Sequence, residues 1–187
     1  MNILTADASD AAEIYRIMTE ARSLMPDPGW YCTDSEKYIR AHIENPDTGI
    51  AFKAVDHGCL AAFFIIHYPG NTPDSLGRYM KLGREDLGRV VHMDSLAVRP
   101  DFRGRGLQSL LMAHGEQYLN ATPYCHLMGT VHPENRYSLN NFLKLGYRIV
   151  ATTEKYGGLP RHVLYKSLSQ PPSFAGSGNN PAPVSIY

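Results

Sequence analysis

The chain of 187 residues is long enough for one domain with a substantial core, and its 43% hydrophobic and 19% charged residues are typical of a globular protein. Positive and negative residues balance at 18 each, which argues against a nucleic-acid-binding protein. The N-terminus has neither a basic segment nor a long apolar run, so we expect no signal peptide and no membrane span. Cys32, Cys59 and Cys125 are odd in number and far apart, which favours a reducing, cytoplasmic location over a disulfide-linked fold.

Apolar residues at alternating and helical spacings predict a mixed α and β chain without internal repeats. The first helix takes Ser9-Asp10 as its N-cap, and the turn Asp56-His57-Gly58 predicts a β-hairpin between two strands. In chain order, the predicted elements are strand 3–5, helix 10–25, helix 34–45, strands 50–55, 59–68 and 90–98, helix 107–118, strand 124–131, helix 137–145, and strands 148–153 and 162–167.

Two segments depart from this regular pattern. Residues 69–89 are polar and rich in glycine, and a connection of this length inside a domain is more often a functional lid or binding loop than a spacer. After Leu168 the sequence is rich in Pro, Gly, Ser and Asn. We therefore expect one folded domain, 1–168, and a flexible tail, 169–187.

The most informative segment runs from His92 to Gln108. Its strand leads into Arg103-Gly104-Arg105-Gly106, a turn whose glycines leave successive backbone N–H groups uncovered, and a helix begins directly afterwards. These N–H groups and the positive end of the helix favour a bound phosphate, to which the two arginines add charge. Other phosphate loops fit worse: Gly-x-x-x-x-Gly-Lys-Ser/Thr is absent, and Ser109 stands where the dinucleotide fingerprint requires glycine.

This segment resembles the GNAT superfamily of N-acetyltransferases, in which a strand ending Val-x-Pro precedes Arg-x-x-Gly-x-Gly/Ala at the start of a helix. The matching residues are Val98-Arg99-Pro100 and Arg103-Gly104-Arg105-Gly106-Leu107-Gln108, with Gln108 in place of the last small residue. The resemblance covers 90–166. It implies a single α/β (α+β) domain with a central mixed, mostly antiparallel sheet flanked by helices, whose central strands splay apart to admit acetyl-CoA as cosubstrate.

The resemblance also implies which residues bind the coenzyme. Backbone groups of the strand would hold its pantetheine arm, and the glycine turn would hold its pyrophosphate. Asn135 would bond near the pantetheine, although it is equally suited to cap the helix that follows. The residues expected to bind the coenzyme are Leu96, Ala97, Val98, Arg103, Gly104, Arg105, Gly106, Leu107, Gln108, Asn135 and Phe142.

His92 and Asp94 are the expected catalytic residues. They lie two apart on the strand that leads into the turn, and strand geometry would place both side chains on one face. An alkyl ammonium cannot attack a thioester, so either residue could act as the base, or Asp94 could orient His92. The structural alternatives are a buried strand histidine and a carboxylate that caps a bulge or turn.

Phe142 stands where many relatives have a tyrosine that protonates the leaving thiolate, so the usual general acid is missing. A thiol with a pKa near ~8.5 still gives a tolerable leaving group. The tyrosines considered as substitutes are Tyr137, Tyr147 and Tyr156. The loop aromatics that either line an acceptor pocket or pack internally are Trp30, Tyr31, Tyr68 and Tyr79. No metal-ligand spacing recurs, so no metal is expected.

We therefore expect an N-acetyltransferase that moves an acetyl group from acetyl-CoA to a primary amine of a small molecule, amino acid or peptide, by direct attack in a ternary complex. Two alternatives stay open. Phe142 and Gln108 suggest a non-catalytic acyl-CoA-binding module, and an acyltransferase could use a longer acyl-CoA. The expected partner is the amine acceptor, without nucleic acid or membrane, and a homodimer is left open.

Overall fold

A seven-stranded sheet in the order β1-β2-β3-β4-β5-β7-β6 organises the protein, in a computed structural model that describes residues 1–168. Neighbouring strands are antiparallel except for the parallel pair β4–β5, which confirms the predicted fold class. The expected tail, 169–187, lies outside the described residues. The strands are β1 (Asn2–Thr5), β2 (Gly49–Asp56), β3 (Cys59–His67), β4 (Val90–Val98), β5 (His126–Val131), β6 (Arg148–Lys155) and β7 (Leu159–Ser167).

The helices begin and end close to their predicted positions. Their bounds are α1 (Ala11–Ser23), α2 (Glu36–Glu44), α3 (Arg84–Leu87), α4 (Leu107–Leu119) and α5 (Arg136–Lys144), with short 3-10 helices η1 (Ala8–Asp10), η2 (Pro28–Trp30), η3 (Leu76–Met80) and η4 (Pro100–Phe102). Helix α1 has Asp10 at its N-cap, within the predicted Ser9-Asp10 pair, but the Asp10 side chain makes no cap hydrogen bond to α1. The Asp7 carboxylate accepts from the Ser9 N–H and Asp10 accepts from the Asp7 N–H, so this capping box begins η1, which runs directly into α1.

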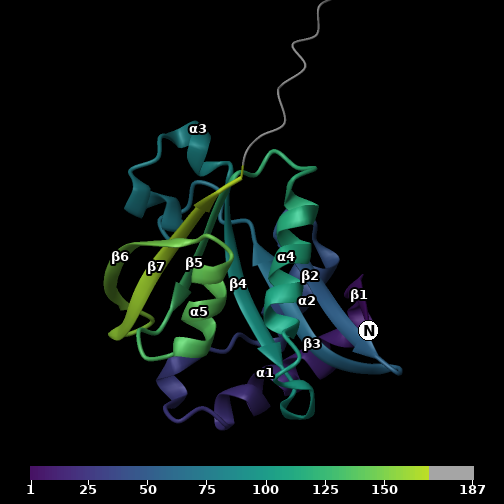
Figure 1. Cartoon of the computed structure of the whole chain (residues 1–187). Coiled ribbons are helices and arrows are strands. Elements are labelled where there is room, and N and C mark those ends of the chain that lie inside the picture. Colours follow the sequence, from purple (N-terminus) through teal and green to yellow (C-terminus); the bar gives the residue numbers. More distant parts are fainter. Residues whose placement is uncertain (169–187) are drawn as a thin grey trace, which may run out of the picture.

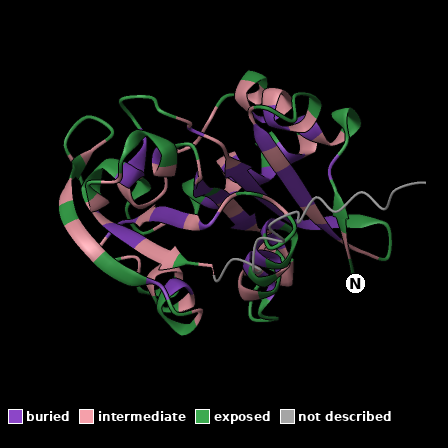
Figure 2. Cartoon of the chain, turned by 90° about the horizontal axis from the view of Figure 1, so that it is seen from above, coloured by how far each residue is buried: buried purple, intermediate pink, exposed green. Residues whose placement is uncertain are grey.

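Helices cover both faces of the sheet, with α4 and α5 in front of it and α1 and α2 behind it in Figure 1. Successive side chains of β3 point to opposite faces of the sheet and so contribute to two cores. Phe63 and Ile65 pack with α1, whereas Phe64 and Ile66 pack with α4. Gly115 permits this close approach, because a Cβ there would lie 2.7 Å from the Phe64 ring. Figure 2 shows buried positions along the central strands and exposed ones on the outer faces of the helices.

The central strands part after a short contact. Strands β4 and β5 pair only from Val90–His126 to His92–Met128. A β-bulge then interrupts the β3–β4 ladder: Ile66 pairs with Met93 and Ile65 with Ser95, so Asp94 has no partner across the ladder. The pairing confirms the predicted splay between these strands, and the bulge lies where the splay begins.

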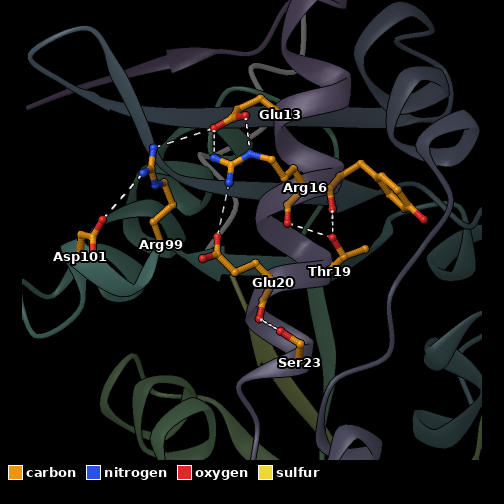
Figure 3. A network of polar contacts seen from close by, with 8 residues as sticks. Glu13, Arg16, Thr19, Glu20, Ser23, Arg99 and Asp101 are labelled. Carbon is orange, nitrogen blue, oxygen red and sulfur yellow. Dashed lines mark hydrogen bonds and ion pairs between the residues drawn. The ribbon is translucent and has the colours of Figure 1, made fainter.

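Ion pairs hold the end of β4 against α1. Figure 3 shows Arg99 between Glu13 and Asp101, with N···O distances of 3.9 and 3.8 Å. Arg16 pairs with the same Glu13 along the helix. Each such surface pair contributes only about 0.2–1 kcal/mol, so these pairs add a small term to the packing of α1 on the sheet.

The segment 69–89 contains η3 and α3 and packs on the sheet through Leu76 and Leu87, which form a third core cluster with Val90, Met128 and Val163. It is therefore anchored at defined points. Within residues 1–168, no helix is both long and apolar enough to span a lipid bilayer.

Candidate functional site

A cavity of about 470 Å³ opens where β4 and β5 part. Its walls come from separate parts of the chain: α2 and the segment before it, the end of β3, segment 69–89, both central strands, and the end of β6 with the turn that follows. The lining residues are Asp34, Tyr38, His67, Asp74, Leu76, His92, Met93, Asp94, Gly129, Thr130, Glu154, Lys155 and Tyr156. The structure thus brings both expected catalytic residues to one cavity.

The bulge presents Asp94 to this cavity. The Tyr38 hydroxyl donates a hydrogen bond of 2.8 Å to its carboxylate. Asp94 keeps solvent contact through the open cavity, yet burial among the surrounding groups raises the pKa of its carboxyl to about 6, against the opposing effect of the Tyr38 bond. Burial, and then the charge of Asp94, raises the pKa of Asp34 to about 7. Both carboxyls therefore titrate close to neutral pH, as groups at functional sites often do.

His92 has a different partner. Its Nε2 atom accepts a hydrogen bond of 3.0 Å from the Leu76 N–H, which ties segment 69–89 to β4. Burial, with smaller effects of His67 and Lys155, lowers the pKa of His92 to about 3, so the ring is neutral at pH 7. Asp94 and His92 bond to separate groups and not to each other among the described residues.

The glycine turn lies at the other end of β4. Gly104 and Gly106 have φ of 78° and 72°, in the left-handed region that glycine tolerates, and Gly106 is the N-cap of α4. In the part of the chain described, the backbone N–H groups from Gly104 to Ser109 have no hydrogen-bond acceptor. Open amides at a helix N-terminus are an anion-binding arrangement, as the spacing predicted.

The two arginines of the glycine turn differ in their ion pairs. Arg105 pairs with Asp56 at 3.3 Å and lies 4.9 Å from the centre of the Phe102 ring. Arg103 is exposed and has no ion pair among residues 1–168. Arg103 is thus the arginine whose charge is available to a ligand at the turn.

Residues 96–98 form one edge of the gap between the central strands. Leu96, Ala97 and Val98 pair with β3 on one side, whereas the register with β5 ends at His92. In an antiparallel strand alternate residues turn their N–H and C=O groups to the other side, so some polar backbone groups of this stretch face the gap.

Helix α5 lies on the side of the gap away from β4 (Figure 1). Gln108 donates from Nε2 to Ser138 Oγ at 3.2 Å, so its side chain bridges α4 and α5 instead of filling the turn. Leu107 is buried in the core, which leaves only its backbone near the turn. Asn135 caps α5 by accepting from the Ser138 N–H at 3.2 Å.

The ring of Phe142, on α5, lies against Gly129 of β5. It is buried, packs edge-on against Tyr147 at 4.9 Å, and would lie 2.8 Å from a Cβ at Gly129. Tyr147 is buried behind it and Tyr137 is 86% exposed, whereas Tyr156 lines the cavity and bonds Thr130 at 3.0 Å. Tyr156 also has a φ of 53°, which few non-glycine residues adopt.

The loop aromatics singled out from the sequence lie outside the lining. Tyr31 bonds Ser95, Tyr68 stacks on Tyr124, and Trp30 lines a separate surface pocket. The aromatic residues that do line the cavity are Tyr38 and Tyr156. Sequence reasoning gave Asp34, Tyr38, His67, Asp74, Glu154 and Lys155 no role at the site.

A family model described as "Acetyltransferase (GNAT) family" matches residues 12–147, more than half of the chain. The fold is similar to yncA from Salmonella typhimurium, whose structure contains its cofactor acetyl-CoA, at a TM-score of 0.70 and 17% identity over 100% of this chain and 99% of that one. It is also similar to the ribosomal-protein-S18-alanine N-acetyltransferase from Escherichia coli, at a TM-score of 0.68 and 18% identity over 92% of this chain and 97% of that one. An acetyltransferase of the GNAT family from Streptococcus pneumoniae has a TM-score of 0.66 and 19% sequence identity, over 90% of this chain and 99% of that one. Among curated proteins there is no match to the sequence.

Proposed function

Since the chain belongs to the acetyltransferase (GNAT) family, we propose that it transfers an acetyl group from acetyl-CoA to a primary amine of a small molecule, amino acid or peptide. The observation that carries this proposal is the position of the cavity. It begins where the gap between β4 and β5 begins, and the open amides of the glycine turn lie at the far end of the same strand. A thioester that followed β4 would therefore reach the cavity.

The residues present fit the coenzyme. The amides from Gly104 to Ser109 and the free charge of Arg103 suit its pyrophosphate, and the turn leaves open space because no atom lies within 4 Å of a Cβ at Gly104 or Gly106. Polar backbone groups of residues 96–98 suit the pantetheine arm. We propose that Asn135, at the N-cap of α5, and Phe142, whose ring lies beside Gly129 of β5, contact the pantetheine from the side opposite β4.

The charges in the cavity favour a cationic acceptor. Its lining carries the carboxylates of Asp34, Asp74, Asp94 and Glu154 against one cation, Lys155. These carboxylates have no ion pair among the described residues. An ammonium group would supply the missing positive charge, which is why we propose an amine and not an alcohol as acceptor.

We assign to Asp94 the contact with the reacting nitrogen. It lies at the bulge beside the end of the gap, and its charge can hold the acceptor ammonium. The hydrogen bond from Leu76 makes His92 the weaker of the two catalytic candidates, because its Nε2 lone pair is already used. We propose that His92 instead holds segment 69–89 over the cavity.

Direct attack then needs few groups. The neutral amine attacks the thioester carbonyl, and a backbone N–H of residues 96–98 would stabilise the oxyanion, where loss of one such donor typically costs ~10²–10³ in rate. The C–S bond breaks and the sulfur takes a proton. Of the three tyrosines considered as its donor, Tyr156 lines the cavity, so we propose it for that role.

Calorimetry with acetyl-CoA, combined with a free-thiol release assay across amines, tests the proposal. Gly106→Ala should weaken acetyl-CoA binding, because the N-cap of α4 needs a left-handed φ, whereas Gly83→Ala at the N-cap of α3 should not. Binding without thiol release for any amine would favour the non-catalytic module. A preference for longer thioesters would favour the acyltransferase alternative.

A further inference from the structure

His67 belongs to a chain of hydrogen bonds behind the cavity. It is the last residue of β3, is half-buried, and pairs across the sheet with Gly49 on one side and His92 on the other. His42 of α2 packs over it, with ring centres 5.1 Å apart. Gly49 makes room for this contact, since a Cβ there would lie 2.6 Å from His42 Cδ2.

The bonds fix where the hydrogen sits on each ring. His42 Nδ1 lies 2.8 Å from the Tyr38 carbonyl oxygen, which can only accept, so Nδ1 carries the hydrogen. Burial lowers the pKa of His42, which keeps its ring neutral and leaves Nε2 as an acceptor. His67 Nδ1 lies 2.9 Å from that Nε2 and must therefore be the donor.

The other nitrogen of His67 is left free. Its Nδ1–H is shared between His42 and the carbonyl oxygen of Thr48, at 3.2 Å. In the neutral ring Nε2 then holds an unprotonated lone pair, and it has no partner among residues 1–168. Because His67 lines the cavity, this lone pair is the part of the ring available to a ligand.

The groups around His67 keep its ring unprotonated in the free protein but allow it to accept a proton. Burial lowers the pKa of His67, while the Thr48 carbonyl and the charge of Asp34 act in the opposite direction. The ring is therefore neutral at pH 7 and its imidazolium has a carboxylate nearby. The titratable groups that share its surroundings are Asp34, Tyr38, His42, Asp74, His92, Asp94, Glu154, Lys155 and Tyr156.

We infer that His67 Nε2 removes the proton that the acceptor ammonium must lose before it attacks, an inference that rests on the proposed function. Asp94 holds the ammonium, and one N–H proton passes to His67. The nitrogen lone pair then forms the C–N bond and the C–S bond breaks. Tyr156 gives its hydroxyl proton to the sulfur and regains a second proton from the nitrogen. The amide and free thiol leave, and His67 returns its proton to solvent, which balances the reaction.

His67→Asn separates this role from a structural one. The asparagine amide nitrogen takes the place of Nδ1 and can still donate to His42 and Thr48, but the variant has no group in place of Nε2. The matched control is His114→Asn, a half-buried histidine that packs on Phe52 on the α4 face of the sheet. The measurements are kcat and KM from pH 5 to 9, acetyl-CoA affinity by calorimetry, and thermal unfolding.

With an ordinary alkyl amine, His67→Asn should lower kcat about 10²–10³-fold while acetyl-CoA affinity changes less than about twofold. With an acceptor amine of pKa near 7, which is largely neutral at pH 8 and above, most of that loss should disappear in that pH range. Imidazole added to His67→Ala should restore rate in proportion to its concentration, which keeps the test usable if the asparagine variant folds poorly.

An unchanged kcat in His67→Asn, or equal losses with the two amines and no response to imidazole, would overturn the assignment. If the wild type is active in the same experiments, the proposed function is not affected by that outcome. A wild type that releases no thiol with any amine would overturn both.

Discussion

Replacement of His92 by glutamine should remove a pH-dependent part of the free energy of unfolding. Burial holds the pKa of His92 at about 3 in the folded protein, against a usual value near ~6.5 in the unfolded chain. Between these values the unfolded state binds more protons, so this contribution is fully present above pH ~6.5 and is lost as the pH falls. Linkage gives a loss of about 2 kcal/mol between pH 7 and pH 5.

Urea unfolding of wild type and His92→Gln at both pH values measures this contribution. Glutamine offers an amide oxygen to the Leu76 N–H but does not titrate in this range. The lowered pKa of His67 and the raised pKa of Asp34 also make stability pH-dependent, but they affect both proteins, so the difference between the proteins isolates His92. Equal losses in the two proteins would refute the reasoning, because His92 would then titrate normally and remain available as a base.

Three further predictions concern two carboxylates of the cavity, Asp94 and Glu154. Asp94→Asn should lower turnover about 10²-fold or more while calorimetry shows unchanged acetyl-CoA affinity, and an unimpaired rate from pH 6 to 9 would remove Asp94 from the chemistry. In wild type, kcat/KM should rise as the pH increases through about 6, since the Asp94 carboxyl ionises there, and Asp94→Asn should lose this part of the rise while keeping the parts due to His67 and Asp34. Glu154→Gln should raise the KM for a cationic amine several-fold with little change in kcat and less salt dependence, whereas Glu85→Gln, outside the cavity, should change neither.

The sequence predicted the glycine turn well because that site is contiguous. The bounds of β4 and the start of α4 follow from one run of residues, and the turn needs only backbone groups and two glycines. The buried face of α4 does not follow from its apolar residues alone: Leu110 and Tyr118 are exposed, because Gly115 draws the helix against the sheet along a neighbouring face.

The cavity at the start of the gap between β4 and β5 could not be predicted in the same way. Asp34, His67, Asp74 and Glu154 come from segments far apart in the chain, and each becomes informative only through its neighbours. Regular strand geometry also predicted that the Met93 side chain lies on the other face of β4 from those of His92 and Asp94. The bulge breaks that alternation, so Met93 lines the same cavity.

The acidic lining of the cavity has a consequence for turnover. In the proposed reaction, acetylation converts a charged ammonium into a neutral amide, so the attraction between the acceptor and the acidic lining is lost when the bond forms. Hydrogen bonds to charged groups contribute roughly 1.5–3 kcal/mol and neutral ones about 0.5–1.5 kcal/mol, a difference of tenfold or so in dissociation constant. The acetylated compound should therefore escape quickly and inhibit weakly, whereas spent coenzyme, which keeps its diphosphate, should be the slower product to depart.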